Sequence, residues 1–202
     1  MRHSFIPLVL ALSFGALTAH ADTLFQVVVN TSSIAGTTGY LDFQFDPGVP
    51  TNSQSATLKI QNFTGATYVA GSQVDTGSAT GGPLPSAITL TNSTDYNDDY
   101  ESVKFGNLMS FTLDFGGAAI NSPNGTSTSG SSFSFEISDA NGNPLLTNDP
   151  NAYDATVNVN LNGSTTAVAE SPQVVFTPEP ASLWMMTGAL ALFGARYARR
   201  SK

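Results

Sequence analysis

Apolar residues recur at every second position in several parts of the chain, which is the period of a β-strand with one buried and one wet face. The alternating segments are 41–45, 58–60, 111–115, 133–137 and 157–161. Further candidate strands are 24–29, 87–90, 102–105 and 173–176. No window of ten or more residues between the two chain ends has helical periodicity. We therefore predict an all-β fold, an antiparallel, jelly-roll-like β-sandwich of eight to ten strands.

Glycine, proline and asparagine mark the connections between these strands. Asp46-Pro47-Gly48 and Asn141-Gly142 are predicted turns, and 81–85 and 121–130 are predicted surface loops. After residue 162 the chain is rich in small and polar residues, and we expect one last strand there, followed by a linker at 177–180.

The first 21 residues have the three parts of a secretory signal peptide. Arg2 and His3 give a positive start, an apolar stretch covers 5–17, and Ala19-His20-Ala21 is a small-x-small cleavage site. We expect the secretion machinery to export the chain and signal peptidase to cut before Asp22.

The C-terminal end has a second signal. Pro178-Glu179-Pro180 precedes an uncharged, mostly apolar run, 181–195, and a basic tail, 196–202. A helix over that run would rise about 22 Å at about 1.5 Å per residue, short of a hydrocarbon core of about 30 Å. We predict a marginal transmembrane helix whose basic tail, with Arg196, Arg199 and Arg200, stays in the cytoplasm.

A proline-glutamate-proline motif, a short apolar helix and an arginine-rich end, in that order, resemble the PEP-CTERM sorting signal of bacterial envelope proteins. The resemblance implies an exosortase-type membrane peptidase that cuts near Pro178, Glu179 and Pro180. It also implies release of the body to the envelope or to an exopolysaccharide matrix such as a biofilm. Three stretches of the body, 39–48, 110–115 and 144–150, resemble one group of PEP-CTERM proteins that has no defined activity.

Composition narrows the chemistry of the body, which we take as one domain, 22–176. It has two cations against fourteen carboxylates, a formal charge of −12, so nucleic acid is a poor partner. The chain has no cysteine, and both histidines precede Asp22. A Ser-His-Asp triad, thiol chemistry and histidine-ligated zinc are therefore excluded from the mature body, and we assign no catalytic residues.

The densest polar segment is a candidate calcium site with the oxygen ligands that this ion prefers. Its candidate ligands are Asp95, Asn97, Asp98, Asp99 and Glu101. The same segment also fits a solvated acidic loop, which needs no ligand and is the simpler interpretation. Farther along, Asp139, Asn141 and Asn143 could chelate calcium, but they are also the residues of a tight turn, which we favour.

Two further possibilities concern glycans. Tyr96 and Tyr100, beside acidic residues, could stack on a sugar ring, although the body has no tryptophan. Asp42, Asp114 and Glu136 lie on predicted strands and could supply a glycosidase pair, but as wet-face residues they need no such role. The leading expectation is thus a non-enzymatic envelope or matrix protein. The alternatives are a carbohydrate- or calcium-binding module and, third, a glycan-active enzyme.

Overall fold

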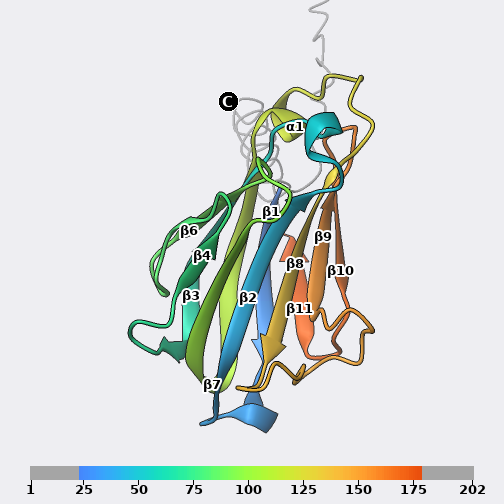
Figure 1. Ribbon diagram of the computed structural model, residues 1–202. Coiled ribbons are helices and arrows are strands. Elements are labelled where there is room, and N and C mark those ends of the chain that lie inside the picture. Colours follow the sequence, from blue (N-terminus) through green and yellow to red (C-terminus); the bar gives the residue numbers. More distant parts are fainter. Residues whose placement is uncertain (1–22, 179–202) are drawn as a thin grey trace, which may run out of the picture.

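In a computed structural model of the chain, residues 23–178 are described, and they are almost entirely β-structure (Figure 1). The strands are β1 (Leu24–Asn30), β2 (Thr38–Pro47), β3 (Thr57–Tyr68), β4 (Val74–Thr76), β5 (Thr80–Gly81), β6 (Ile88–Thr91), β7 (Asp98–Gly116), β8 (Ser131–Ser138), β9 (Ala155–Val159), β10 (Thr165–Ala169) and β11 (Val174–Pro178). The helical elements are single turns, namely η1 (Ser32–Ile34), η2 (Pro50–Asn52) and α1 (Ala118–Asn121). All pairings between these strands are antiparallel, which confirms the all-β class.

Strand β7, 19 residues long, joins the two parts of the sheet. Its first half pairs with β2 and β4, and its second half pairs with β1. β3 pairs with both halves of β7, and the register between the two strands shifts between Gln61 and Ala66. At the shift Gly65 has φ +91°, and a Cβ there would lie 1.9 Å from the Leu108 carbonyl oxygen, so only glycine lets the two backbones approach this closely.

Beside the first half of β7 the strands follow in the order β2, β8, β9 and β10. The second half of β7 has β3, β6 and β5 on one side, and β1 and β11 on the other. Figure 1 shows the long strands running along one common direction.

One aromatic core serves both parts of the sheet. The Phe43 ring of β2 and the Phe135 ring of β8 each contact Phe111 of the second half of β7, with centroids 5.4 and 5.2 Å apart. Phe45 contacts Phe115 of the same half at 5.9 Å. These rings are at most 3% exposed, as the alternation of β2, β7 and β8 predicts. The buried face of β2 and β8 therefore packs on the buried face of the second half of β7.

The strand count differs from the expected eight to ten, because the described residues form eleven strands. Segments 102–105 and 111–115 belong to one strand, β7, which continues because it changes partners rather than ending. β4, β5 and β10 have no fully buried residue and hence no apolar alternation to reveal them. Thr177 and Pro178 were expected in a linker, but they pair with Gln26 and Phe25 and complete β11.

Several expectations lie outside the described residues. The signal-peptide residues Ala19, Ala21 and Asp22 fall before residue 23, and Glu179, Pro180, the apolar run 181–195 and the three arginines fall after residue 178. Across 23–178, none of the helices has the length and apolar character needed to cross a membrane. The predicted turn at Asn141-Gly142 is confirmed, since Gly142 has φ +79° and its N–H donates to the Asp139 carbonyl at 3.0 Å.

Candidate binding face

The wet side of β2, β7 and β8 forms a continuous surface of polar side chains, which we call the polar face. On β2 it consists of Tyr40, Asp42, Gln44 and Asp46, all half-buried. The strand register places Tyr100 and Glu136 on either side of Asp42, and Asp98 and Ser134 on either side of Gln44. Directly opposed residues share a face of a sheet, so three strands contribute to one surface.

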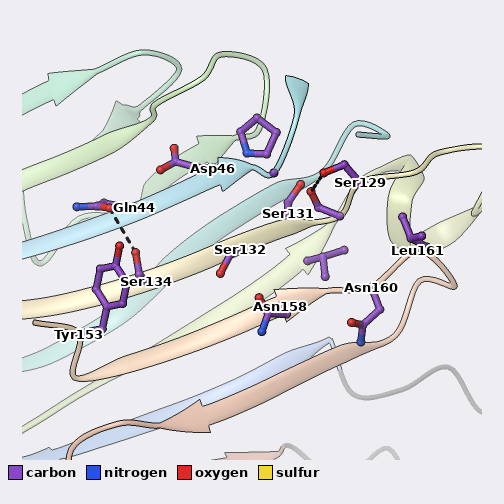
Figure 2. A pocket seen from close by; sticks show the side chains of 14 residues that line it. Gln44, Asp46, Ser129, Ser131, Ser132, Ser134, Tyr153, Asn158, Asn160 and Leu161 are labelled. Carbon is purple, nitrogen blue, oxygen red and sulfur yellow. Dashed lines mark hydrogen bonds between the residues drawn. The ribbon is translucent and has the colours of Figure 1, made fainter. Parts of the chain in front are cut away.

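A groove of about 460 Å³ opens on the polar face between β2, β8 and β9 (Figure 2). Its walls are mainly hydroxyl, amide and carboxylate groups with one tyrosine. The side chains labelled in Figure 2 are Gln44, Asp46, Ser129, Ser131, Ser132, Ser134, Tyr153, Asn158, Asn160 and Leu161. Ser134 donates a long hydrogen bond of 3.4 Å to Gln44, and Asn158 is exposed to solvent. Ser131 and Ser134 are buried, whereas Asn158 is exposed and the other polar side chains of the groove are half-buried, so a ligand in the groove would contact mainly the latter groups.

The carboxylates beside the groove are crowded and partly desolvated. Burial raises the pKa of Asp42 to about 7 despite a 2.8 Å hydrogen bond from the Gln44 amide, and neighbouring Asp98 and Glu136 add to the rise. The pKa of Glu136 is also raised by burial. One oxygen each of Asp42 and Asp98 is buried and accepts no hydrogen bond within the described residues. These two oxygens are shielded from solvent, so they are not free acceptors for a ligand in the groove.

Aromatic rings flank the same carboxylates. Tyr96, 44% exposed, lies close enough to Asp42, Asp98, Asp46 and Tyr153 that these groups, after burial, raise its pKa. Tyr100 instead stacks on Tyr40, with ring centroids 4.7 Å apart and planes 11° apart. Of the two tyrosines predicted to stack on sugar, Tyr96 therefore keeps an exposed ring, whereas one face of the Tyr100 ring is already covered. Tyr153, which the sequence did not single out, lines the groove itself.

The residues of the candidate calcium segment do not lie together in the structure. Asp95 is exposed in the loop before β7, Asp98 lies on the polar face, and Asp99 and Glu101 lie on the opposite side, toward the core. Alternate residues of a strand face opposite ways, so the five candidates cannot surround one ion. The solvated-loop interpretation is also wrong for residues 97–101, because Asn97, Asp99 and Glu101 are 0% exposed.

Asn97 has a structural role at the start of β7. Its amide nitrogen donates to the carbonyl oxygens of Phe45 and Thr94 at 3.1 and 2.9 Å, and its side-chain oxygen accepts from Ser78. Its backbone N–H donates to Asp46 at 2.7 Å. Burial raises the pKa of Asp46, and these bonds from Asn97 oppose the rise. Asn97 thus fixes Asp46 at the edge of the groove.

On the core side of β7, three carboxylates meet, and we call Asp75, Asp99 and Glu101 together with Gln73 the inner cluster. Asp75 of β4 is directly opposite Asp99, and the Asp99 carboxyl contacts those of both Asp75 and Glu101. Burial, followed by the contact with Asp75, raises the pKa of Asp99 to about 8, and burial also raises that of Glu101. In residues 23–178, no group of three or more Asp, Glu, His or Cys side chains has metal-site spacing.

The remaining acidic candidates lie at different places in the fold. Asp42 and Glu136 are directly opposed on β2 and β8, but Asp114 is opposite Lys59 in the other part of the sheet and cannot join them. Asp139 closes its own turn, accepting from the backbone N–H groups of Asn141 and Asn143 at 2.7 and 2.9 Å. The Asn143 side chain, together with these bonds, lowers the Asp139 pKa. The turn interpretation of this segment is confirmed.

Comparison with known proteins gives no match, since no family model, curated protein or solved structure is significantly similar to this chain. The binding role must therefore be inferred from the chemistry of the polar face alone. The exposed Asn158 amide, the half-buried amides and hydroxyls of the groove and the exposed ring of Tyr96 suit a polyhydroxylated ligand, which offers both donors and an apolar ring face.

Proposed function

We propose that this chain is an exported, non-enzymatic protein of the bacterial envelope or extracellular matrix that binds saccharide on its polar face. In this proposal the body is a jelly-roll-like β-sandwich. The observation that carries the binding role is the open groove between β2, β8 and β9, with its lining of serine, asparagine and glutamine side chains beside Tyr153. An exopolysaccharide is the expected partner, because it presents many hydroxyls and suits a surface protein released into a matrix.

The sorting route rests on the two terminal signals. Signal peptidase would cut after Ala21, and an exosortase-type peptidase would recognise and cut near Pro178, Glu179 and Pro180 while the run 181–195 holds the chain in the membrane. Arg196, Arg199 and Arg200 would fix the orientation.

Binding is tested with the complete chain, purified in mild detergent, against immobilised bacterial exopolysaccharides and a panel of oligosaccharides. Asn158→Ala, which removes an exposed amide from the groove, is expected to weaken binding. Asn151→Ala is the matched control, since Asn151 is equally exposed but does not line the groove. No retained saccharide with the wild-type chain, or equal loss in both variants, would remove the binding role.

Glycan hydrolysis is the second candidate, because Asp42 and Glu136 are directly opposed and both have raised pKa values. A raised pKa is what a general acid needs, and two neighbouring carboxylates are the usual equipment of glycosidases. Release of reducing ends from the same glycan panel distinguishes the two functions. Turnover that Asp42→Asn abolishes would replace the binding proposal with an enzymatic one.

A further inference from the structure

A second hollow lies between η2 and the loop 122–128, and we call it the loop hollow. Its volume is about 340 Å³, and every residue that lines it is a threonine, serine, asparagine or glutamine. Thr126 and Thr128 are exposed there, and their hydroxyls have no hydrogen-bond partner among the described residues. The loop hollow therefore offers free hydroxyl groups to a ligand, as donors and as acceptors.

Hydrogen bonds hold the two walls of the loop hollow together. Gln54 Nε2 donates to the Ser122 carbonyl at 2.9 Å, and Gln54 Oε1 accepts the Asn124 N–H at 2.9 Å. On the η2 side, the Asn52 carbonyl accepts the Thr128 N–H at 3.2 Å. Both walls are thus fixed before a ligand arrives, which lowers the conformational entropy that binding would cost.

The groove of the polar face ends beside the loop hollow. Figure 2 shows Gln44 at one end of the groove and Ser129 and Leu161 at the other. A small pocket of about 10 Å³ shares Ser129 with the groove and Ser127 with the loop hollow, so the two larger hollows are neighbours. The groove follows the chain from Gln44 to Gly48, about 13 Å at about 3.3 Å per residue, which is longer than one sugar ring.

The charges around these hollows disfavour an acidic ligand. Among the described residues that line the groove, the small pocket and the loop hollow, Asp46 is the single charged one. Residues 23–178 contain two cations, and Lys104 is opposite Thr38, about 20 Å along β2 from Gln44. The other, Lys59, is on β3 in the other part of the sheet. A uronate or sulfate group would therefore meet a carboxylate and no cation, whereas a neutral sugar meets amides and hydroxyls.

We infer that the loop hollow is a second sugar-binding subsite, and that the ligand is an extended, neutral polysaccharide that reaches from the groove onto the loop hollow. This inference rests on the proposed saccharide-binding function. The small pocket between the hollows has no room for a ring, so the two subsites bind different rings of one chain. A disaccharide occupies the groove alone, and affinity increases once the chain is long enough to reach the loop hollow.

The test is calorimetric titration of the complete chain, in mild detergent, with disaccharides and octasaccharides. The neutral probes are oligomers of glucan, mannan and galactan, and the acidic probes are oligomers of alginate and polygalacturonate. We expect at least one neutral octasaccharide to bind about 10-fold or more tightly than its disaccharide, because its second contact is intramolecular. The acidic octasaccharides should bind more weakly than that neutral one.

Three variants locate the subsites. Thr126→Ala removes an exposed hydroxyl of the loop hollow but keeps the backbone hydrogen bond of 3.0 Å to Asn124. It should weaken binding of the neutral octasaccharide by about 2–10-fold, as expected for one lost hydrogen bond, and leave disaccharide binding unchanged. Asn158→Ala, in the groove, should weaken both. Thr76→Ala is the control for Thr126→Ala and should weaken neither, since Thr76 is exposed on β4 and lines neither hollow.

Equal affinity for the two chain lengths, or octasaccharide binding that Thr126→Ala leaves unchanged, would overturn the second subsite. Tighter binding of an acidic octasaccharide would overturn the neutral class of ligand. In either case, binding that Asn158→Ala weakens would still support the proposed function. Failure of every probe to bind would remove the proposed function together with this inference.

Discussion

The buried carboxyl of Asp154 should make the stability of the fold depend on pH. Its carboxyl is 0% exposed between β8 and β9, where Oδ2 accepts the Ile137 N–H at 2.8 Å and Oδ1 has no partner among the described residues. Burial raises its pKa to about 7, and the charge of nearby Glu136 adds to this. The folded protein therefore holds a proton on Asp154 in a pH range in which the unfolded chain, with an ordinary aspartate pKa of 3.8, has lost it.

The sign and size of the pH effect on the free energy of unfolding follow from this difference in pKa. Well below pH 4 both states are protonated and the stabilisation is fully present. As the pH rises from about 4 to about 7, the unfolded chain is stabilised by losing a proton that the folded state still holds, so the free energy of unfolding falls. At about 1.4 kcal/mol per pKa unit, a rise from 3.8 to about 7 corresponds to about 4 kcal/mol lost by pH 8. Other raised carboxyls, Asp42 among them, add loss in the same direction, so the Asp154 contribution is the difference between wild type and a variant without this carboxyl, and we expect that difference to change by up to about 4 kcal/mol.

The perturbation is Asp154→Asn, which keeps an acceptor for the Ile137 N–H but cannot lose a proton. Urea unfolding of wild type and variant at pH 4, 6 and 8 measures the free energy of unfolding. The wild type should lose stability relative to the variant as the pH rises. Asp139→Asn is a control that should show almost no pH-dependent difference from wild type over this range, because the pKa of Asp139 is lowered from 3.8 and its contribution is lost only at more acid pH. A constant difference between wild type and Asp154→Asn across the range would refute the reasoning.

Three further predictions concern packing, backbone and sorting. Phe111→Ala removes a ring that contacts Phe43 and Phe135, and should lower the free energy of unfolding by about 3–5 kcal/mol in urea titration, whereas a change under 1 kcal/mol would contradict the shared core. Gly65→Ala, at φ +91° and against the Leu108 carbonyl, should lower the melting temperature, and an unchanged value would contradict the close approach of β3 and β7. Neutral replacement of Arg196, Arg199 and Arg200 together should leave uncut precursor in a pulse-chase, while normal processing would show the cluster to be incidental.

Elements that depend on local pattern could be predicted from the amino-acid order alone. Alternation of apolar residues predicted β2, β8 and the second half of β7, because a strand turns every second side chain to the same face whatever surrounds it. The turn at Asn141-Gly142 was equally local, since glycine tolerates a positive φ. The terminal signals are also readable as linear patterns, and they remain predictions.

The environment of each acidic residue, in contrast, depends on the assembled fold. The pattern placed Asp98 and Asp99 in one polar segment, but β2 and β4 pair with the two edges of β7 there, which turns Asp98 to the polar face and Asp99 to the core side. Asp75 joins Asp99, and Asp42 joins Glu136, through strand pairing that no short sequence window contains. A carboxylate's burial, and with it its pKa and its partners, depends on which strands pack against it, and that is a property of the assembled sheet.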